Sequence, residues 1–279
     1  MKFGAHSLMW TPVFTEENLH LFDKLKEMGF SGIEILLNDL ERMPIDKIRQ
    51  KADKTNMQVM CAVALDEAHN PISPDPKVRE KAVEFLKSRI SAARDLNAHL
   101  ATGVTYASWG TFSGKQRTED EWQRSIETLH QVTDYLEETG VTLGLEAINR
   151  YETYFINTAE DAKKMVEEVN NPKVKVHLDT YHMNIEEKSF YEPIKLVGED
   201  LCHIHLCEND RGIPGSGHVD WKGIFKALDE IEYEKWAVVE TFVPALEDIA
   251  RQTAVWRKLA PSVDELAEKA LAYFKEFTE

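Results

Sequence analysis

The chain alternates between short apolar runs and longer stretches in which apolar residues recur every three or four positions. The short runs have the composition of buried strands, and the longer stretches have the period of amphipathic helices. The short runs predict strands at Lys2–Leu8, Gly32–Leu37, Gln58–Leu65, His99–Thr105, Thr142–Ile148, Val174–Asp179, Leu201–Cys207 and Trp236–Thr241. The longer stretches predict helices, among them Thr15–Met28, Pro76–Leu96, Thr118–Thr139, Thr158–Val169, Trp221–Ile231, Leu246–Lys258 and Ser262–Phe277.

Local signals at the helix ends agree with this pattern. Gly29 and Gly140 directly follow predicted helices, where glycine accepts the left-handed backbone that ends a helix. Thr118 lies three residues before a glutamate, and so does Ser262, which is the spacing of a capping box. These signals place helix boundaries independently of the apolar period.

Strict alternation of strands and helices implies a parallel sheet. Eight such units in 279 residues predict an α/β fold, a (β/α)₈ TIM barrel with an additional C-terminal helix, as a single domain over residues 1–279. A doubly wound sheet is the alternative. The first strand–helix turn, at residues 8–16, lacks the GxGxxG pattern that such a sheet uses for dinucleotides.

Composition and net charge narrow the classes of molecule that the protein can bind. The chain has 33 Lys and Arg against 49 Asp and Glu, a net charge of −16, which argues against nucleic acid and anionic lipid as partners. No apolar stretch is long enough to cross a membrane. The N-terminal MKFGAHSLMW has no secretory h-region, and three sparse cysteines fit a reduced compartment, so we expect a cytoplasmic protein.

A barrel carries its chemistry at the C-terminal ends of its strands. The last four predicted strands each bring one metal-competent side chain to that end: Glu146, Asp179, His205 and Glu240. An acid after a strand can be only a helix cap, but four such residues on successive strands favour a metal site, because buried charges need partners. Three carboxylates and one imidazole suit Mn²⁺, Mg²⁺ or Co²⁺. His177 and His203 lie two residues earlier in their strands, so we expect them to pack one layer deeper.

Four segments carry a family resemblance: GLEAINRYETYFINT, HLDTYHMNIEE, HIHLCENDRGIPGSGHVDW and VVETF. They resemble the ketose 3-epimerases, the D-tagatose 3-epimerase and D-psicose (allulose) 3-epimerase group of the xylose-isomerase-like barrels. The resemblance implies epimerisation at C3 of free ketoses, a divalent metal, Mn²⁺ with Co²⁺ or Mg²⁺ as alternatives, and a homodimer or homotetramer. It implies that the metal ligands are Glu146, Asp179, His205 and Glu240.

The resemblance also implies a set of substrate-binding residues: Glu152, His182, Arg211, Trp109 and Phe242. Arg211 could otherwise form a surface ion pair with its acidic neighbours. His6 and Trp10 follow the first strand and are candidates for the pocket wall, with a packed loop aromatic as the alternative for Trp10. The segment GAHSLMW departs from some family members, which carry tyrosines after the glycine, and this leaves the substrate preference open.

The chemistry of C3 epimerisation fits these residues. A proton must leave one face of the carbon and return to the other, which requires two acid/base groups, and Glu146 and Glu240 come from the first and last of the four strands. A metal acting as a Lewis acid stabilises the enediolate formed in between. A sugar isomerase or inosose-type dehydratase is the nearest alternative. An endonuclease IV-like phosphodiesterase and a non-catalytic sugar-binding barrel are further ones, and the net charge counts against the former.

Overall fold

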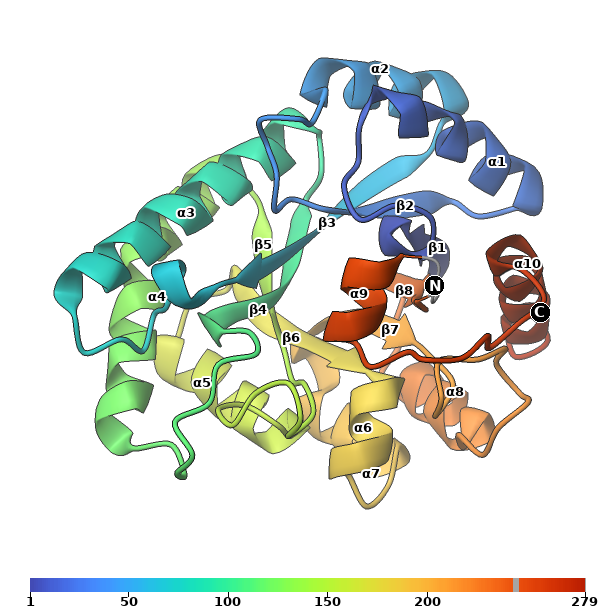
Figure 1. Cartoon of the computed structure of the whole chain (residues 1–279). Coiled ribbons are helices and arrows are strands. Elements are labelled where there is room, and N and C mark those ends of the chain that lie inside the picture. Colours follow the sequence, from blue (N-terminus) through green and yellow to red (C-terminus); the bar gives the residue numbers. More distant parts are fainter. Residues whose placement is uncertain (243–245, 279) are drawn as a thin grey trace.

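The fold is described from a computed structural model of the chain, which describes residues 1–242 and 246–278. Its strands form a closed barrel in chain order, and β8 pairs with β1 (Figure 1). The strands are β1 (Lys2–His6), β2 (Gly32–Leu36), β3 (Gln58–Leu65), β4 (Leu100–Ser108), β5 (Thr142–Glu146), β6 (Val174–Asp179), β7 (Leu201–Leu206) and β8 (Trp236–Val239). All pairings are parallel, so the predicted (β/α)₈ barrel is confirmed and the doubly wound sheet is wrong.

Helices surround the barrel (Figure 1). They are α1 (His20–Met28), α2 (Ile45–Thr55), α3 (Pro76–Asp95), α4 (Glu119–Thr139), α5 (Ala159–Val169), α6 (Thr180–Glu186), α7 (Tyr191–Val197), α8 (Trp221–Glu230), α9 (Glu247–Gln252) and α10 (Val263–Lys275). Several predicted helix ends are confirmed: Gly29 and Gly140 have left-handed backbones, and Thr118 forms a complete capping box with Glu121. The predicted additional C-terminal helix is α10. Its Phe274 packs against Trp221 and Phe225 of α8.

The structure differs from the predicted pattern in one helix and adds bounds to two connections. The helix predicted at Leu246–Lys258 ends at Gln252, because Ala254 adopts a left-handed backbone and Val255 turns into a small apolar cluster with Phe242. The connection from β2 to β3, for which no helix bounds were predicted, holds α2, which buries Ile48 and Ala52. The connection from β6 to β7, also without predicted bounds, holds the two short helices α6 and α7.

The barrel interior is built from every second residue of its strands, which positions the site. Met60, Leu100, Cys202 and Val238 fill its lower end as an apolar layer. The residues that point inward one layer above are polar, and they belong to the same continuous strands. The side chains that a TIM barrel uses for chemistry therefore stand on a packed apolar base.

Gly103 gives a test of how tightly β4 packs against β3. Its φ of +129° is a glycine conformation, and a methyl group there would meet the Val63 carbonyl oxygen. Gly103→Ala is expected to lower the free energy of unfolding by at least about 3 kcal/mol, because backbone strain and a steric clash add. The matched control is Gly140→Ala, which has φ of +74° with open space around it and should cost about 1 kcal/mol. Urea denaturation measures both free energies of unfolding, and equal decreases in the two variants would contradict tight packing of β4 against β3.

Candidate active site

The four predicted strand-end residues meet at one point of the barrel. Glu146 ends β5, Asp179 ends β6, His205 lies in β7 and Glu240 directly follows β8. All four are buried. The Nδ1 atom of His205 lies 3.9 Å from Glu146 Oε1, 3.7 Å from Asp179 Oδ2 and 3.5 Å from Glu240 Oε2. The sequence therefore located a true cluster, in which one imidazole nitrogen faces three carboxylates.

This donor set fits a divalent cation. The Nδ1 atom of His205 is buried and has no hydrogen-bond partner among the described residues. Two atoms bound to one ion at 2.0–2.2 Å lie at most about 4.4 Å apart, and the three distances from Nδ1 meet that limit. Glu146, Asp179 and His205 are also mutually close enough to hold one ion. Hard oxygen donors with one imidazole suit Mn²⁺, Mg²⁺ or Co²⁺.

The charges of the cluster are unequally balanced. Burial raises the pKa of Glu146 well above its ordinary value, and the neighbouring Glu240 and Asp179 add to the rise although His205 opposes it. Burial also disfavours the charge of Glu240, but His205 and Arg211 lower its pKa below the ordinary value. Without a bound cation, Glu146 is therefore the carboxyl group for which the cluster supplies too little positive charge.

Arg211 is part of the cluster and not a surface residue. Its guanidinium is buried, and Nη1 lies 2.7 Å from Glu240 Oε2 and 3.4 Å from Asp179 Oδ2. Its φ is +60°, a left-handed conformation that is uncommon for a side-chain-bearing residue. The Thr241 hydroxyl donates to the carbonyl oxygen of Arg211 and helps to hold this strained turn. The alternative of a surface ion pair is thus wrong.

Glu208 holds the loop that carries Arg211, and it was read only as an acidic neighbour. Its buried carboxylate accepts hydrogen bonds from the backbone of Gly215 at 2.8 Å and of Val219 at 3.1 Å, and from Trp221 Nε1 at 3.1 Å. A side chain at Gly217 would collide with it. The glycine-rich segment therefore wraps a buried carboxylate, and Asp220 after it caps α8 by accepting from the backbone of Gly223.

A second network joins four side chains beside the cluster. Trp109 Nε1 donates to Glu152 Oε2 at 2.9 Å, and Asn149 Nδ2 donates to Glu152 Oε1 at 2.8 Å. The backbone N–H and the side-chain amide of Asn149 both lie within 3.1 Å of His182 Nδ1, which must therefore be the accepting nitrogen. Asn149 was not predicted. Its position three residues after Glu146, inside the motif that carries the resemblance, was the available signal.

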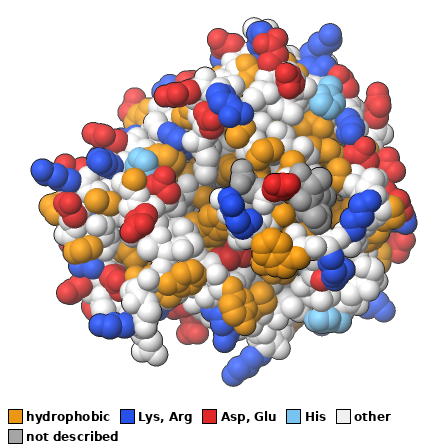
Figure 2. Space-filling view, viewed as in Figure 1, with side chains coloured by type: hydrophobic (Ala, Val, Ile, Leu, Met, Phe, Trp, Pro, Cys, Tyr) orange, Lys and Arg blue, Asp and Glu red, His pale blue; other side chains and the backbone are white. Residues whose placement is uncertain are grey.

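The cluster opens into a pocket with about 770 Å³ free of atoms, its mouth included, which is in the range of small-molecule sites. Its walls include nine of the ten predicted site residues: His6, Trp109, Glu146, Glu152, His182, His205, Arg211, Glu240 and Phe242. Asp179 lies behind them and is fully buried. Trp10 does not line the pocket; its indole N–H donates to Asp264 instead. Figure 2 shows hydrophobic side chains gathered near the centre of this face, with charged side chains around them.

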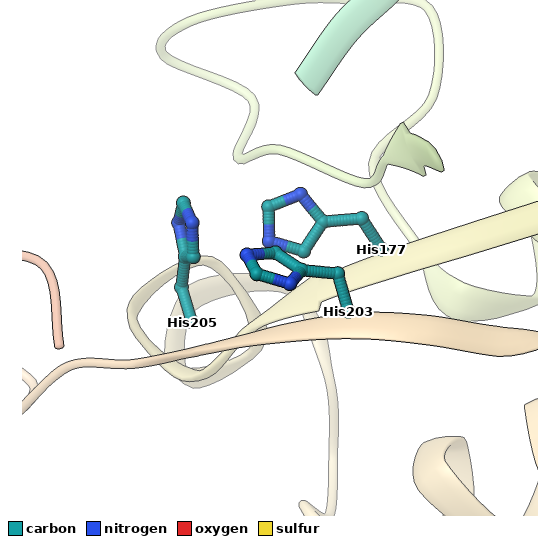
Figure 3. Close-up of side chains that lie close together, drawn as sticks. All are labelled: His177, His203 and His205. Atoms are coloured by element: carbon teal, nitrogen blue, oxygen red, sulfur yellow. The ribbon is translucent and has the colours of Figure 1, made fainter. Parts of the chain in front are cut away.

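His177 and His203 lie beside His205 and form a layer with it (Figure 3). The rings of His177 and His205 meet edge to face with centroids 4.2 Å apart, and His203 lies 4.7 Å from His177. Burial lowers the pKa of His177 and of His203. Glu34 of β2 lies beside this layer and contacts both His203 and His205. His177 and His203 therefore pack below the rim, as their positions in the strands predicted, whereas Glu34 was missed.

Comparisons with known proteins now identify the class. A sequence profile of the xylose isomerase-like TIM barrel family matches residues 22–271, so the chain belongs to this family. It is 32% identical to the D-psicose 3-epimerase of Enterocloster bolteae, over 96% of this chain and 91% of that one. It is 32% identical to the ketose 3-epimerase of Arthrobacter globiformis, over 99% and 96%. Within the barrel family, these two relatives are ketose 3-epimerases, the group that the sequence motifs indicated.

A solved structure agrees with these sequence comparisons. The D-allulose 3-epimerase of Methylomonas sp., determined in complex with D-allulose, superimposes with a TM-score of 0.94 at 29% identity, covering 99% of this chain and 96% of that chain. Among the described residues, no helix has the length and apolar character needed to cross a membrane.

The opposite pKa shifts of two glutamates predict opposite stability effects in chelator-treated protein. The raised pKa of Glu146 means that the folded protein holds more protons than the unfolded chain above about pH 4.3, so stability falls as pH rises. Glu146→Gln should therefore raise Tm at neutral pH. The lowered pKa of Glu240 adds stability above about pH 4.3 that is lost as pH falls. Glu240→Gln should lower Tm at neutral pH.

Thermal melts of both variants and the unaltered protein between pH 4 and 8 check this pair. The Glu146→Gln difference should shrink as the pH falls towards 4, because Glu146 is then protonated in the folded protein and becomes protonated in the unfolded chain. The Glu240→Gln difference should largely persist over this range, because the lowered pKa keeps Glu240 charged in the folded protein. Shifts of the same sign at neutral pH would contradict the charge balance derived from the cluster.

Proposed function

We propose that the protein is a divalent-metal-dependent epimerase that inverts C3 of a free ketose. D-Fructose/D-psicose, D-tagatose/D-sorbose and L-ribulose/L-xylulose are the candidate pairs. The observation that carries the proposal is the convergence of three buried carboxylates on the unpartnered Nδ1 of His205, at the base of a pocket. The family relationship supports the substrate class, since those relatives are named for ketoses.

Glu146, Asp179, His205 and Glu240 would hold the ion, Mn²⁺ by preference and Co²⁺ or Mg²⁺ as alternatives. When bound, the ion supplies Lewis-acid stabilisation of negative charge on substrate oxygens. Glu146 and Glu240 are the proposed acid/base pair: one removes the proton from C3, and the other returns a proton to the opposite face. They reach the cluster from β5 and β8, with β6 and β7 between them, which allows a substrate carbon to lie between two carboxyl groups.

The remaining residues would orient the sugar. Arg211 is fixed by Glu240 and Asp179 and lies over the ring of Phe242 at 4.6 Å, so it can donate to a substrate oxygen from a defined position. His182 accepts from Asn149 through Nδ1, which makes its Nε2 the donor. Glu152, held by Trp109 and Asn149, can accept from hydroxyl groups.

The pocket favours an uncharged substrate over a phosphorylated one. Glu34, Glu146, Glu152 and Glu240 line it, whereas Arg211, the one Lys or Arg among its described lining residues, is already paired with carboxylates. A phosphate group carries nearly two negative charges, and beyond the proposed cation it would meet no unpaired Lys or Arg among those residues. We also keep the predictions of a homodimer or homotetramer and of a cytoplasmic location.

The direct test is product analysis in D₂O with Mn²⁺, using D-fructose, D-tagatose and L-ribulose as substrates. The C3 epimer should form, and it should carry deuterium at C3, because the proton returned to that carbon exchanges with solvent. Chelation should abolish turnover, and Mn²⁺ or Co²⁺ should restore it. Formation of aldoses or loss of water would favour the isomerase or dehydratase alternatives, and full activity in excess chelator would refute the metal assignment.

The acid/base pair has its own test. Glu146→Gln and Glu240→Gln should each lower kcat by at least about 10²-fold, since a positioned acid or base contributes that much or more. Asp264→Asn serves as the control, because this carboxylate binds Trp10 and Lys24 and does not line the pocket. A glutamine variant that keeps kcat within a few-fold of the unaltered enzyme would remove that residue from the proposed pair.

A further inference from the structure

We propose that Glu34 is a positioning residue that fixes His205 in the orientation and tautomer needed to bind the metal. The inference rests on the proposed function, because it concerns the same cation. Glu34 belongs to β2 and His205 to β7, so the contact ties together two strands that are three positions apart around the barrel. Glu34 and His203 are completely buried, and His205 is nearly so.

A single oxygen atom of Glu34 makes both contacts. Oε2 lies 2.8 Å from His203 Nε2 and 3.0 Å from His205 Nε2. These are ordinary hydrogen-bond distances, and one carboxylate oxygen can accept two N–H groups through its two lone pairs. Both imidazoles therefore donate from Nε2.

The tautomer of His205 has a direct consequence at the cluster. A neutral imidazole that donates from Nε2 has its lone pair on Nδ1, and this is the atom that faces the three carboxylates. A metal-binding histidine typically donates its other ring nitrogen to a carboxylate, which sets the tautomer and the ring plane. Glu34 occupies this position relative to His205.

The surrounding layer leaves this ring little freedom to turn. His177 packs edge to face against His205 (Figure 3). His203 contacts the same oxygen atom of Glu34 as His205 does. Although ring nitrogens of the three histidines lie within 4.8 Å of one another, Glu34 already engages Nε2 of His203 and of His205. These two nitrogens are therefore already hydrogen-bonded to Glu34, and the three histidines do not form a second cation site.

The experiment compares Mn²⁺ binding by isothermal titration calorimetry in three variants and the unaltered protein. Glu34→Met keeps the volume but removes the acceptor, and it should weaken binding by about 10–100-fold, the usual effect of losing such a partner. Glu34→Gln keeps an acceptor oxygen without its charge. Its Kd for Mn²⁺ should lie between those of the unaltered protein and of Glu34→Met, because charge-assisted hydrogen bonds are about twice as strong as neutral ones.

His203→Leu is the matched control, since it removes the other hydrogen bond to Glu34 in the same buried layer and leaves the bond to His205. It should keep the Kd for Mn²⁺ within about threefold, because the Glu34 partner of the metal-binding ring is retained. In metal-free protein, burial lowers the pKa of His205, but Glu240 and Glu34 outweigh it and raise this pKa well above its ordinary value, so the tautomer is read at alkaline pH, where the ring is neutral. There ¹⁵N NMR of labelled histidines should show the His205 proton on Nε2, and Glu34→Met should lose this preference.

The outcomes separate this inference from the proposed function. Absence of Mn²⁺ and Co²⁺ binding to the unaltered protein would refute the metal-dependent function itself. Tight binding that Glu34→Met leaves within about twofold, with the His205 tautomer unchanged, would overturn only the role of Glu34. Equal weakening by His203→Leu would overturn it as well. If Glu34→Met does not fold, Glu34→Gln decides by the same two measurements.

Discussion

The burial of three carboxylates around one imidazole is the constraint on which the rest of this molecule depends. Charges removed from water are costly unless partners surround them, and the barrel supplies those partners from several strands and loops. Arg211 lies against Glu240 and Asp179, and it adopts a left-handed backbone to reach them. Its loop is in turn held by the buried carboxylate of Glu208. Each partner thus requires a further partner behind it, and the polar network extends outward from the cluster.

The same constraint explains what lies beneath the cluster. A buried ring whose free nitrogen faces anions needs its other nitrogen bonded, and Glu34 meets this need for His205. The apolar layer of Met60, Leu100, Cys202 and Val238 then supports the polar layer from below. Because protein interiors are close-packed, such a base limits the freedom of side chains above it. The precision of the site therefore depends on barrel packing as much as on the residues that face the pocket.

Much of the fold and of the site could be predicted from the sequence. The features that were missed have one physical cause in common. Residue period and strand ends are local properties, so the barrel and the meeting of Glu146, Asp179, His205 and Glu240 could be derived from them. Contacts across the barrel depend on register, which the sequence does not display. The pairing of β6 with β7 shifts between Val176 and His177, and this shift decides which β7 residues point inward. Glu34 was therefore read as part of an apolar strand, although a lone acid in the middle of GIEIL was a usable signal.

The pocket divides into two halves with different physical roles. Its base is charged and braced on every side, so the reaction performed there is determined by groups that have little freedom to vary. The rest of its wall carries apolar side chains such as Leu8, Leu36 and Ile249, beside the polar Asn38, Gln252 and Thr253. Contacts with such a wall discriminate weakly between sugars, because one methylene group changes binding by only about 1–3 kcal/mol. Selection among substrates would then come from polar groups of the lining such as His6, which belongs to the segment GAHSLMW, where some members of the family carry tyrosines. Its Nδ1 accepts from the backbone of Leu8, which makes Nε2 its donor, and this buried nitrogen faces Glu240 at 4.0 Å.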